Sequence, residues 1–292
     1  MLLGDSGRVK TIDAGKGGDM KENGAEEIKR AVAARYGAHA RRRLEELEAS
    51  QASCCAPAEP LTSEASSCAC CSDAPAEADL NMARHIYSSE ELKDLPEDVL
   101  TSLGCGNPTA IAELREGERV LDLGSGGGLD CFLAARQVKR GGLVCGLDMS
   151  PEMVQLARRN AERVGAENVR FWLGEMEQMP FPSNSFDVII SNCVINLSPD
   201  KDAVLRECYR VLRPGGRLRV SDIVWTREPS AEERSNLESW TSCVAGALTE
   251  EAYVSKLRAA GFQNARVERK GDGDTPVGNL FSGYIVAEKA RG

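Results

Sequence analysis

Histidine is almost absent from this sequence: only His39 and His85 occur among the 292 residues. Oxygen and nitrogen acceptors commonly need a base to remove a proton, and histidine is the side chain used most often. In this chain that role would fall to a carboxylate or another group. Long apolar runs are absent too, because no stretch of roughly 18 apolar residues occurs. We therefore expect no segment that spans a membrane.

An excess of basic residues is also lacking. Lys and Arg number 36 against 45 Asp and Glu, which gives a formal net charge of −9. Because phosphates are bound by basic side chains, this balance argues against nucleic acid and acidic membranes as partners. The segment Met1–Asp19 lacks the apolar core of a signal peptide, which predicts a cytoplasmic protein. The eleven cysteines then need an explanation other than structural disulfides, which a reducing compartment disfavours.

Residues 1–80 are predicted to form an N-terminal extension ahead of a folded domain over residues 81–292. Within the extension, Ile28, Val32 and Tyr36 recur at four-residue steps, which predicts a helix over 22–48. The following segment, 49–80, is rich in Ala, Ser, Pro and Glu and cannot build a core. We expect it to be a flexible linker or lid.

Five cysteines lie in that segment: Cys54, Cys55, Cys68, Cys70 and Cys71. Three interpretations stay open at this point. The cysteines have no role in an exposed tract, or they bind zinc, although two Cys-x-x-Cys pairs are lacking. Alternatively, they form a mobile thiol arm that reaches a site elsewhere.

The folded domain alternates strands and helices as a doubly wound α/β sheet does. The predicted strands cover residues 119–123, 143–147, 168–173, 185–191, 217–223, 265–268 and 281–288. The main predicted helices cover residues 151–164, 200–212, 231–243 and 250–260. We expect the last two strands to pair antiparallel at the edge of the sheet.

The stretch Val120–Asp130 combines a strand, a glycine-rich turn and the start of a helix, which together make a nucleotide cradle. Asp148 ends the next strand, where an acid can bind both hydroxyls of a ribose. These features would also suit a nicotinamide cofactor. Alternatively, the glycine-rich turn binds no nucleotide at all. However, Asp122 precedes the glycines, where it would repel a pyrophosphate and instead suits a cation such as a sulfonium. Glu175 and Met176, after the third strand, suit the edge and face of an adenine.

With Pro214-Gly215-Gly216 and the terminal strand pair, these turns resemble the S-adenosylmethionine-dependent methyltransferases over roughly residues 100 to 290. The resemblance implies a seven-stranded, doubly wound Rossmann-like sheet that binds S-adenosylmethionine. It implies these contacts: Gly124, Ser125, Gly126 and Gly128 around the methionine part, Asp148 and Met149 at the ribose and adenine, Glu175 and Met176 at the adenine rim, and Asn192 near the methionine end. By the same resemblance, Asp122 supports the loop or contacts the donor through water.

Three further cysteines stand where loops meet the expected donor site: Cys105, Cys193 and Cys243. Residues far apart in sequence converge in such a fold, because the sheet gathers its ligand at the carboxyl ends of the strands. A chance grouping is the alternative. Three thiolates are soft ligands that suit As(III), whose lone pair carries no proton to remove, so the shortage of histidine fits. The remaining cysteines are expected in the core: Cys131, Cys145 and Cys208.

Four segments resemble the arsenite methyltransferases closely: Ser102–Pro108, Leu121–Gly126, Ser191–Lys201 and Cys243–Leu248. The family implies that Cys105, Cys193 and Cys243 bind As(III), supplied as arsenite or its thiol conjugates. It also implies a redox-active N-terminal cysteine, for which Cys70 or Cys71 is the best positional match and Cys54-Cys55 the second. A thiol reductant, glutathione or thioredoxin, is the implied co-substrate.

Two other functions stay open. One is a C- or O-methyltransferase for a small molecule such as a quinone, with the cysteines incidental. The other is a metalloid-binding protein without catalytic activity. Both would keep the fold, and only the site chemistry distinguishes them.

Overall fold

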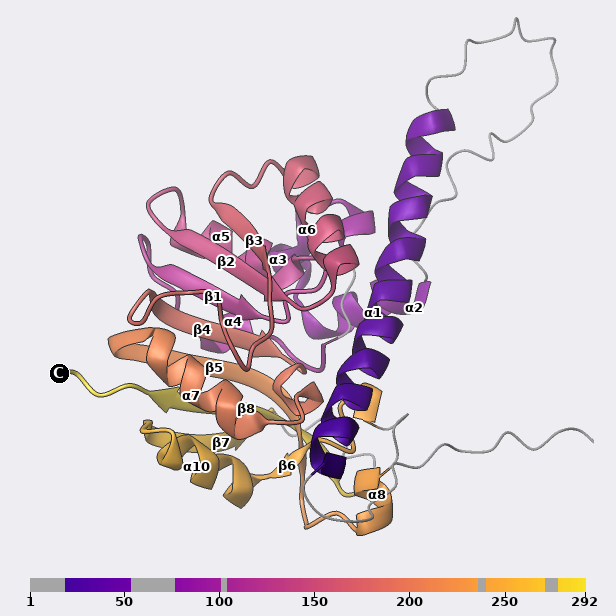
Figure 1. Cartoon of the computed structure of the whole chain (residues 1–292). Coiled ribbons are helices and arrows are strands. Elements are labelled where there is room, and N and C mark those ends of the chain that lie inside the picture. The colour runs from indigo at the N-terminus through magenta and orange to yellow at the C-terminus, as the bar shows by residue number, and fades with distance from the viewer. Residues whose placement is uncertain (1–18, 54–76, 101–103, 236–239, 271–277) are drawn as a thin grey trace, which may run out of the picture.

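The computed structural model describes residues 19–53, 77–100, 104–235, 240–270 and 278–292. A single mixed sheet lies at its centre, with helices on both faces and one long helix standing beside it (Figure 1). The strands are β1 (Arg119–Leu123), β2 (Leu143–Asp148), β3 (Val169–Leu173), β4 (Phe186–Asn192), β5 (Leu212–Trp225), β6 (Leu248–Thr249), β7 (Gln263–Arg269) and β8 (Leu280–Glu288). Their order across the sheet is β3-β2-β1-β4-β5-β8-β7, and β6 pairs with β5.

The predicted α/β doubly wound sheet is confirmed. Strands β1 to β5 pair in parallel, so their carboxyl ends lie along one edge of the sheet. Strand β8 pairs antiparallel with both β5 and β7. The antiparallel pairing of the last two strands is thus as expected. Of these two strands, β7 lies at the edge of the sheet, whereas β8 lies between β5 and β7.

Two details differ from the sequence prediction. The two-residue strand β6 is additional, because a segment this short carries no periodic signal. Strand β5 begins at Leu212 rather than 217, and the Pro214-Gly215-Gly216 segment forms a bulge in its pairing with β4. Gly215 has a φ of +78°, a conformation that glycine adopts without steric cost.

Each face of the sheet packs against its own helices. Helices α5 (Leu129–Val138) and α6 (Pro151–Val164) cover one face, together with the short helices α2 (Glu77–Ile86), α3 (Ser89–Leu92) and α4 (Pro108–Ile111). Helices α7 (Lys201–Val211) and α10 (Glu250–Ala259) cover the other. The helix predicted over 231–243 appears as α8 (Ala231–Ser235), and residues 236–239 lie outside the described ranges. Two short 3-10 turns also occur: η2 (Glu97–Val99) and η3 (Ile195–Leu197).

Helix α1 (Asp19–Ser53) extends the predicted helix by a few residues at each end. Its apolar side packs on α6, where Leu44 and Leu47 join Met153 and Leu156 in one buried cluster. Figure 1 shows that the helix runs along the carboxyl edge of the parallel strands. The boundary proposed at residue 80 stays a prediction, but α1 contributes directly to the site described below.

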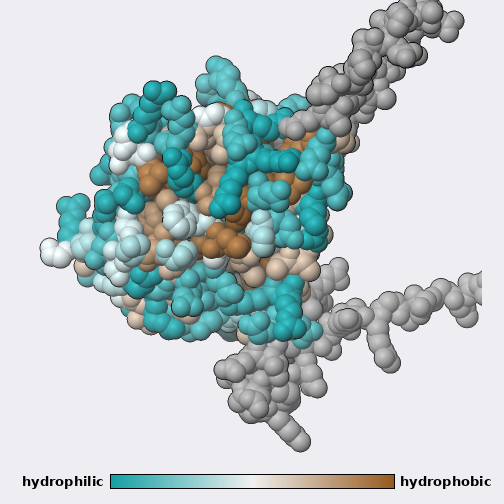
Figure 2. Space-filling view, turned by 45° about the horizontal axis from the view of Figure 1, so that its top comes forward, coloured by the Kyte–Doolittle hydropathy of each residue, from teal (hydrophilic) through white to brown (hydrophobic). Residues whose placement is uncertain are grey.

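The surface around the domain is mostly polar. Figure 2 shows hydrophobic side chains gathered near the middle of one face, inside a rim of hydrophilic ones. Across the described ranges, none of the helices combines the length and apolar character needed to cross a bilayer.

Candidate functional site

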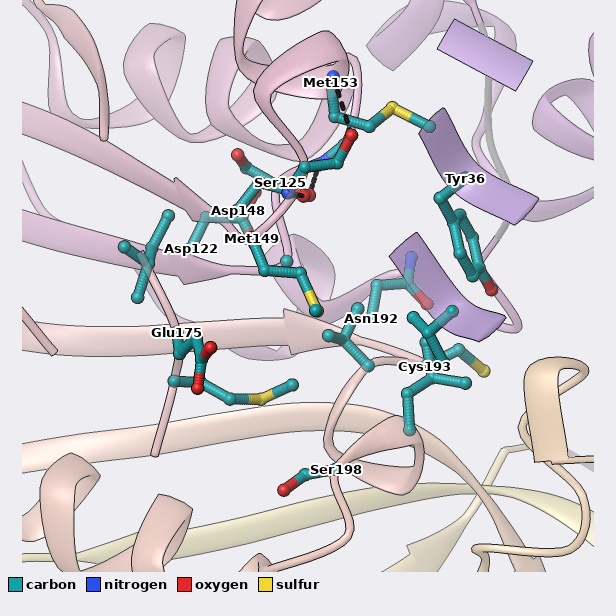
Figure 3. A pocket seen from close by; sticks show the side chains of 18 of the residues that line it. Tyr36, Asp122, Ser125, Asp148, Met149, Met153, Glu175, Asn192, Cys193 and Ser198 are labelled. Atoms are coloured by element: carbon teal, nitrogen blue, oxygen red, sulfur yellow. Dashed lines mark hydrogen bonds between the residues drawn. The ribbon is translucent and has the colours of Figure 1, made fainter. Parts of the chain in front are cut away.

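A pocket opens at the carboxyl ends of β1, β2, β3 and β4, and α1 lies over it (Figure 3). Every donor-binding residue expected from the sequence lines this pocket except Gly128: Asp122, Gly124, Ser125, Gly126, Asp148, Met149, Glu175, Met176 and Asn192. Gly128 instead caps the start of α5 with a φ of +94°. The pocket is therefore a product of the sheet topology, which brings four strand ends together.

Hydrogen bonds from backbone amides connect the glycine loop to the side chain of Asp148. The amide of Gly126 donates a hydrogen bond of 2.9 Å to one carboxylate oxygen of Asp148, and the amide of Ser150 donates one of the same length to the other. These bonds partly offset the burial that raises the pKa of Asp148. A Cβ on Gly126 would meet nothing within 4 Å, and the buried hydroxyl of Ser125 has no hydrogen-bond partner among the described residues. The loop therefore offers open space and an unused polar group to a ligand.

Two buried acids stand behind the loop. Burial, together with the neighbouring Asp130, raises the pKa of Asp122 well above its ordinary value, and Asp122 accepts a hydrogen bond from the thiol of Cys131. Burial also raises the pKa of Asp130 to about 6, although Asn192 and Tyr87 donate hydrogen bonds to it. A cation bound here would favour the charged form of both acids. The site thus suits the sulfonium of S-adenosylmethionine.

Asn192, at the end of β4, anchors the segment that carries Cys105. Its side-chain oxygen accepts hydrogen bonds from the amides of Cys105 and Gly106, at 3.0 and 3.2 Å. The flanking glycines are required by close packing: a Cβ on Gly104 would lie 2.3 Å from Asn192, and one on Gly106 would lie 2.0 Å from Ser221. The Gly-Cys-Gly sequence therefore lets Cys105 reach the ends of β4 and β5.

The three expected cysteines gather in one place. Cys105 and Cys193 form a disulfide, with their Cα atoms 5.9 Å apart. The thiol of Cys243 donates a hydrogen bond of 2.8 Å to the backbone oxygen of Cys193. All three belong to one apolar cluster that also contains Tyr36 and Trp240. Cys193 also lines the pocket at the strand ends, which is called the donor pocket below because the sequence predicts that it binds the methyl donor. The sulfur cluster therefore adjoins this pocket.

Two of these cysteines have unusual backbone conformations. Cys193 has a φ of +57° and Cys243 a φ of +64°, which residues other than glycine rarely adopt. Such conformations cost of order 1–3 kcal/mol and concentrate at functional sites. Burial, with Asp222 nearby, raises the pKa of Cys243 to about 12, so this thiol holds its proton at neutral pH.

The structure differs from the sequence expectation in one respect. Three free thiols were expected, but Cys105 and Cys193 are bonded to each other, and among the described residues no group of three ligating side chains is arranged for a metal ion. The five N-terminal cysteines, including Cys70 and Cys71, lie outside the described residues. Cys131, Cys145 and Cys208 are buried in the core, as expected.

Some pocket residues were missed from the sequence. Lys29 and Tyr36 reach the pocket from α1, and Lys29 lies 2.5 Å from Glu175 and 3.6 Å from Glu177. Helical periodicity indicated that α1 has an apolar side, but not which surface it covers. Tyr87 was missed because its link to Asp130, a hydrogen bond of 2.9 Å, spans 43 residues.

Comparisons with known proteins agree with this geometry. Residues 114–261 match a family model described as a methyltransferase domain. Arsenite methyltransferase of Halobacterium salinarum is 42% identical over 231 residues, covering 75% of this chain and 58% of its own length. The human protein of the same name is 40% identical over 183 residues, covering 59% and 48%. An arsenic(III) S-adenosylmethionine methyltransferase from Chlamydomonas reinhardtii superposes with a TM-score of 0.53 at 33% identity, covering 73% of each chain.

Fold, donor pocket and matched domain together define an S-adenosylmethionine-dependent methyltransferase. Within that class, the chain belongs to the arsenite methyltransferase family. It spans 58% of the length of the Halobacterium relative and about half of the human one, 48%.

Proposed function

We propose that the protein transfers methyl groups from S-adenosylmethionine to As(III) held by the thiols of Cys105, Cys193 and Cys243. The observation that carries this proposal is the single sulfur cluster at the edge of the donor pocket. Soft thiolates hold trivalent arsenic and leave its lone pair free. No titrating base is then needed at the acceptor, in keeping with the lining of the donor pocket, which includes no histidine among the described residues.

The chemistry is a displacement. The arsenic lone pair forms the new bond to carbon, and the electrons of the broken carbon–sulfur bond return to the donor sulfur, which becomes a neutral thioether. Positioning is the main contribution of the protein, and fixed geometry is worth roughly 7–11 kcal/mol in favourable systems. Asn192 and the Gly-Cys-Gly segment position one sulfur, while the turn that follows Trp240 positions another.

A redox step accompanies the transfer. Methylation oxidises arsenic by two electrons, and two cysteine thiols can return them by forming a disulfide and releasing two protons. The Cys105–Cys193 bond is consistent with that oxidised form of the enzyme. An external thiol such as glutathione or thioredoxin would then reduce the bond by exchange and become oxidised itself. Cys70 or Cys71 is the proposed additional redox cysteine, and the reducing cytoplasm is the proposed location.

Substitution of single sulfurs tests the proposal. We expect Cys193→Ser and Cys243→Ser to lower the yield of methylated arsenicals, measured by mass spectrometry, by at least about 100-fold, because a misplaced acceptor loses the in-line geometry. Cys145→Ala, in the core, is the matched control and should retain activity. Donor binding should persist in all three variants. Full activity in both serine variants would refute the role of the cysteines.

Fluorescence separates this function from methylation of a quinone-like acceptor. Trp240 lies in the cysteine cluster, whereas Trp172 is 45% exposed on β3. Arsenite added to the reduced protein should change the emission of the Trp172→Phe variant and leave that of Trp240→Phe closer to constant. No response in either variant would favour an acceptor that does not contact the sulfurs. Tight binding without methylated product would indicate a sequestering protein instead.

A further inference from the structure

A second pocket adjoins the cysteine cluster and shares the side chain of Tyr36 with the donor pocket. It is formed by the middle of α1 and by residues 241–243, and Cys243 and Tyr36 belong to its lining. Tyr36 lines both pockets, and its hydroxyl donates a hydrogen bond of 3.5 Å to the backbone oxygen of Thr241. Cys193 lines the first pocket, and Cys243 the second. The sulfur cluster therefore contributes one cysteine to the lining of each pocket.

The two pockets carry opposite charges. The donor pocket contains five acids and one lysine: Asp122, Asp130, Asp148, Glu175, Glu177 and Lys29. The ionisable side chains other than the tyrosine and cysteine in the second pocket are all basic: Arg35, His39 and Arg42. The chain as a whole has a net charge of −9, so a local group of basic side chains beside a buried thiol opposes the general charge. Such a group attracts anions.

The arginines are held toward the pocket by their neighbours. One guanidinium nitrogen of Arg35 donates hydrogen bonds of 3.1 Å to the hydroxyls of both Thr241 and Ser242. Arg42 lies 3.3 Å from His39, and its only described acid, Glu46, is 3.9 Å away. Much of the hydrogen-bonding capacity of both guanidinium groups therefore remains for a carboxylate, which they can bind in a two-pronged arrangement.

We propose that this second pocket binds the carboxylates of an acidic thiol that carries As(III), and so guides the arsenic to Cys243. The inference rests on the proposed function and adds to it an entry site for the acceptor. In this arrangement the cationic methyl donor and the anionic arsenic carrier enter through different openings. Neither ligand has to pass the other, and the opposite charges keep each in its own pocket.

The transfer itself is a balanced exchange. The bond from arsenic to one carrier sulfur breaks as the bond from arsenic to the Cys243 sulfur forms. The proton of the Cys243 thiol goes to the departing carrier thiolate, and no electrons are gained or lost.

Carriers that differ only in charge test the proposal. Initial rates of methylation are measured with arsenic supplied as its conjugate with glutathione or with neutral 2-mercaptoethanol. Arg35→Gln and Arg42→Gln should each raise KM for the glutathione conjugate by roughly 5- to 30-fold, as for the loss of a charge-assisted hydrogen bond. The KM for the neutral conjugate should change less than about twofold. Arg30→Gln, on the same helix but outside the pocket, is the control.

Salt provides an independent measurement. The preference of the unmodified protein for the glutathione conjugate should shrink as ionic strength rises, because screening weakens partly exposed charge pairs. Equal losses with both carriers in the arginine variants would show a structural role only and overturn the proposal. No loss with either carrier would also overturn it, while leaving the methyltransferase function intact. Failure of the unmodified protein to methylate either conjugate would instead count against the proposed function.

Discussion

At the scale of single residues, Asn192 joins three parts of the chain. Its side-chain oxygen accepts a hydrogen bond from the amide of Cys105. Its side-chain nitrogen donates hydrogen bonds to the hydroxyl of Tyr87, which precedes α3, and to the carboxylate of Asp130 on α5. Asn192→Ala would leave the amides of Cys105 and Gly106 without an acceptor, at about 1–3 kcal/mol for each buried group. We expect the free energy of unfolding in urea to fall by about 2–4 kcal/mol. The exposed Gln178→Ala should stay within about 0.5 kcal/mol of the unmodified protein, and an unchanged midpoint for Asn192→Ala would contradict the anchoring role.

Asp222 makes stability depend on pH. Burial raises its pKa to about 7, while the Tyr253 hydroxyl, at 3.0 Å, and Lys201 act in the opposite direction. Because the folded pKa lies above the unfolded value of about 3.9, the folded state keeps this proton longer than the unfolded state. Stability from this group is therefore complete below about pH 4 and is lost as pH rises toward 7.

Asp222→Asn removes that titration without changing the size of the side chain. The difference in unfolding free energy between this variant and the unmodified protein should shift in favour of the variant between pH 4 and 7, by up to about 4 kcal/mol. Urea titrations at several pH values provide the measurement. A difference that stays constant over this window would show that Asp222 ionises normally. Above pH 7 the comparison also includes Lys201, whose pKa burial lowers to about 8.

At the scale of elements, α1 lies over the donor pocket and contributes Lys29 and Tyr36 to its lining. Apart from packing on α6, it pairs Lys29 with Glu175 across the pocket rim. A partly exposed ion pair is worth about 0.2–1 kcal/mol. Lys29→Gln should therefore speed the dissociation of S-adenosylmethionine by up to about fivefold, measured by stopped-flow fluorescence. In Arg30→Gln, S-adenosylmethionine should dissociate at the same rate as from the unmodified protein. If the two variants gave equal rates, the Lys29–Glu175 ion pair would have no role in retaining the donor.

The positions of the strands and the doubly wound class of the sheet could largely be predicted from the sequence, whereas the order of the strands comes from the structure. Buried parallel strands are short apolar runs with turns at both ends, and the glycine loop marks where the first one stops. The bulge at Pro214–Gly216 and the strand β6 could not, because they depend on pairing across the sheet. Most of the residues that line the pocket could be named from the sequence, since they lie at or just after the carboxyl ends of strands, while their binding of the donor stays a prediction. The contribution of α1 was not, because an amphipathic helix does not specify the surface it covers.

At the scale of the whole molecule, the Cys105–Cys193 bond links segments 88 residues apart. A cross-link of that span reduces the entropy of the unfolded chain by an amount worth up to about 4–5 kcal/mol. The oxidised protein should therefore unfold at a higher temperature than the reduced one, as measured by calorimetry with and without a thiol reductant. In Cys105→Ser the two conditions should give the same midpoint. A higher midpoint for the reduced form would contradict this.

The left-handed backbone conformation of Cys193 and Cys243 lowers the stability of the fold, while the proposed catalysis requires cysteine at both positions. Glycine is the residue that this conformation accommodates most easily, and replacing either cysteine by glycine should be less damaging to the fold than replacing it by alanine, by up to about 1–2 kcal/mol. In a library of variants kept reduced, so that Cys193 gains nothing from its disulfide, sorting for resistance to heat would favour glycine over alanine at both positions. Growth in arsenic would enrich only sulfur there. The two positions would thus be ones where cysteine is retained for activity although glycine would give a more stable fold.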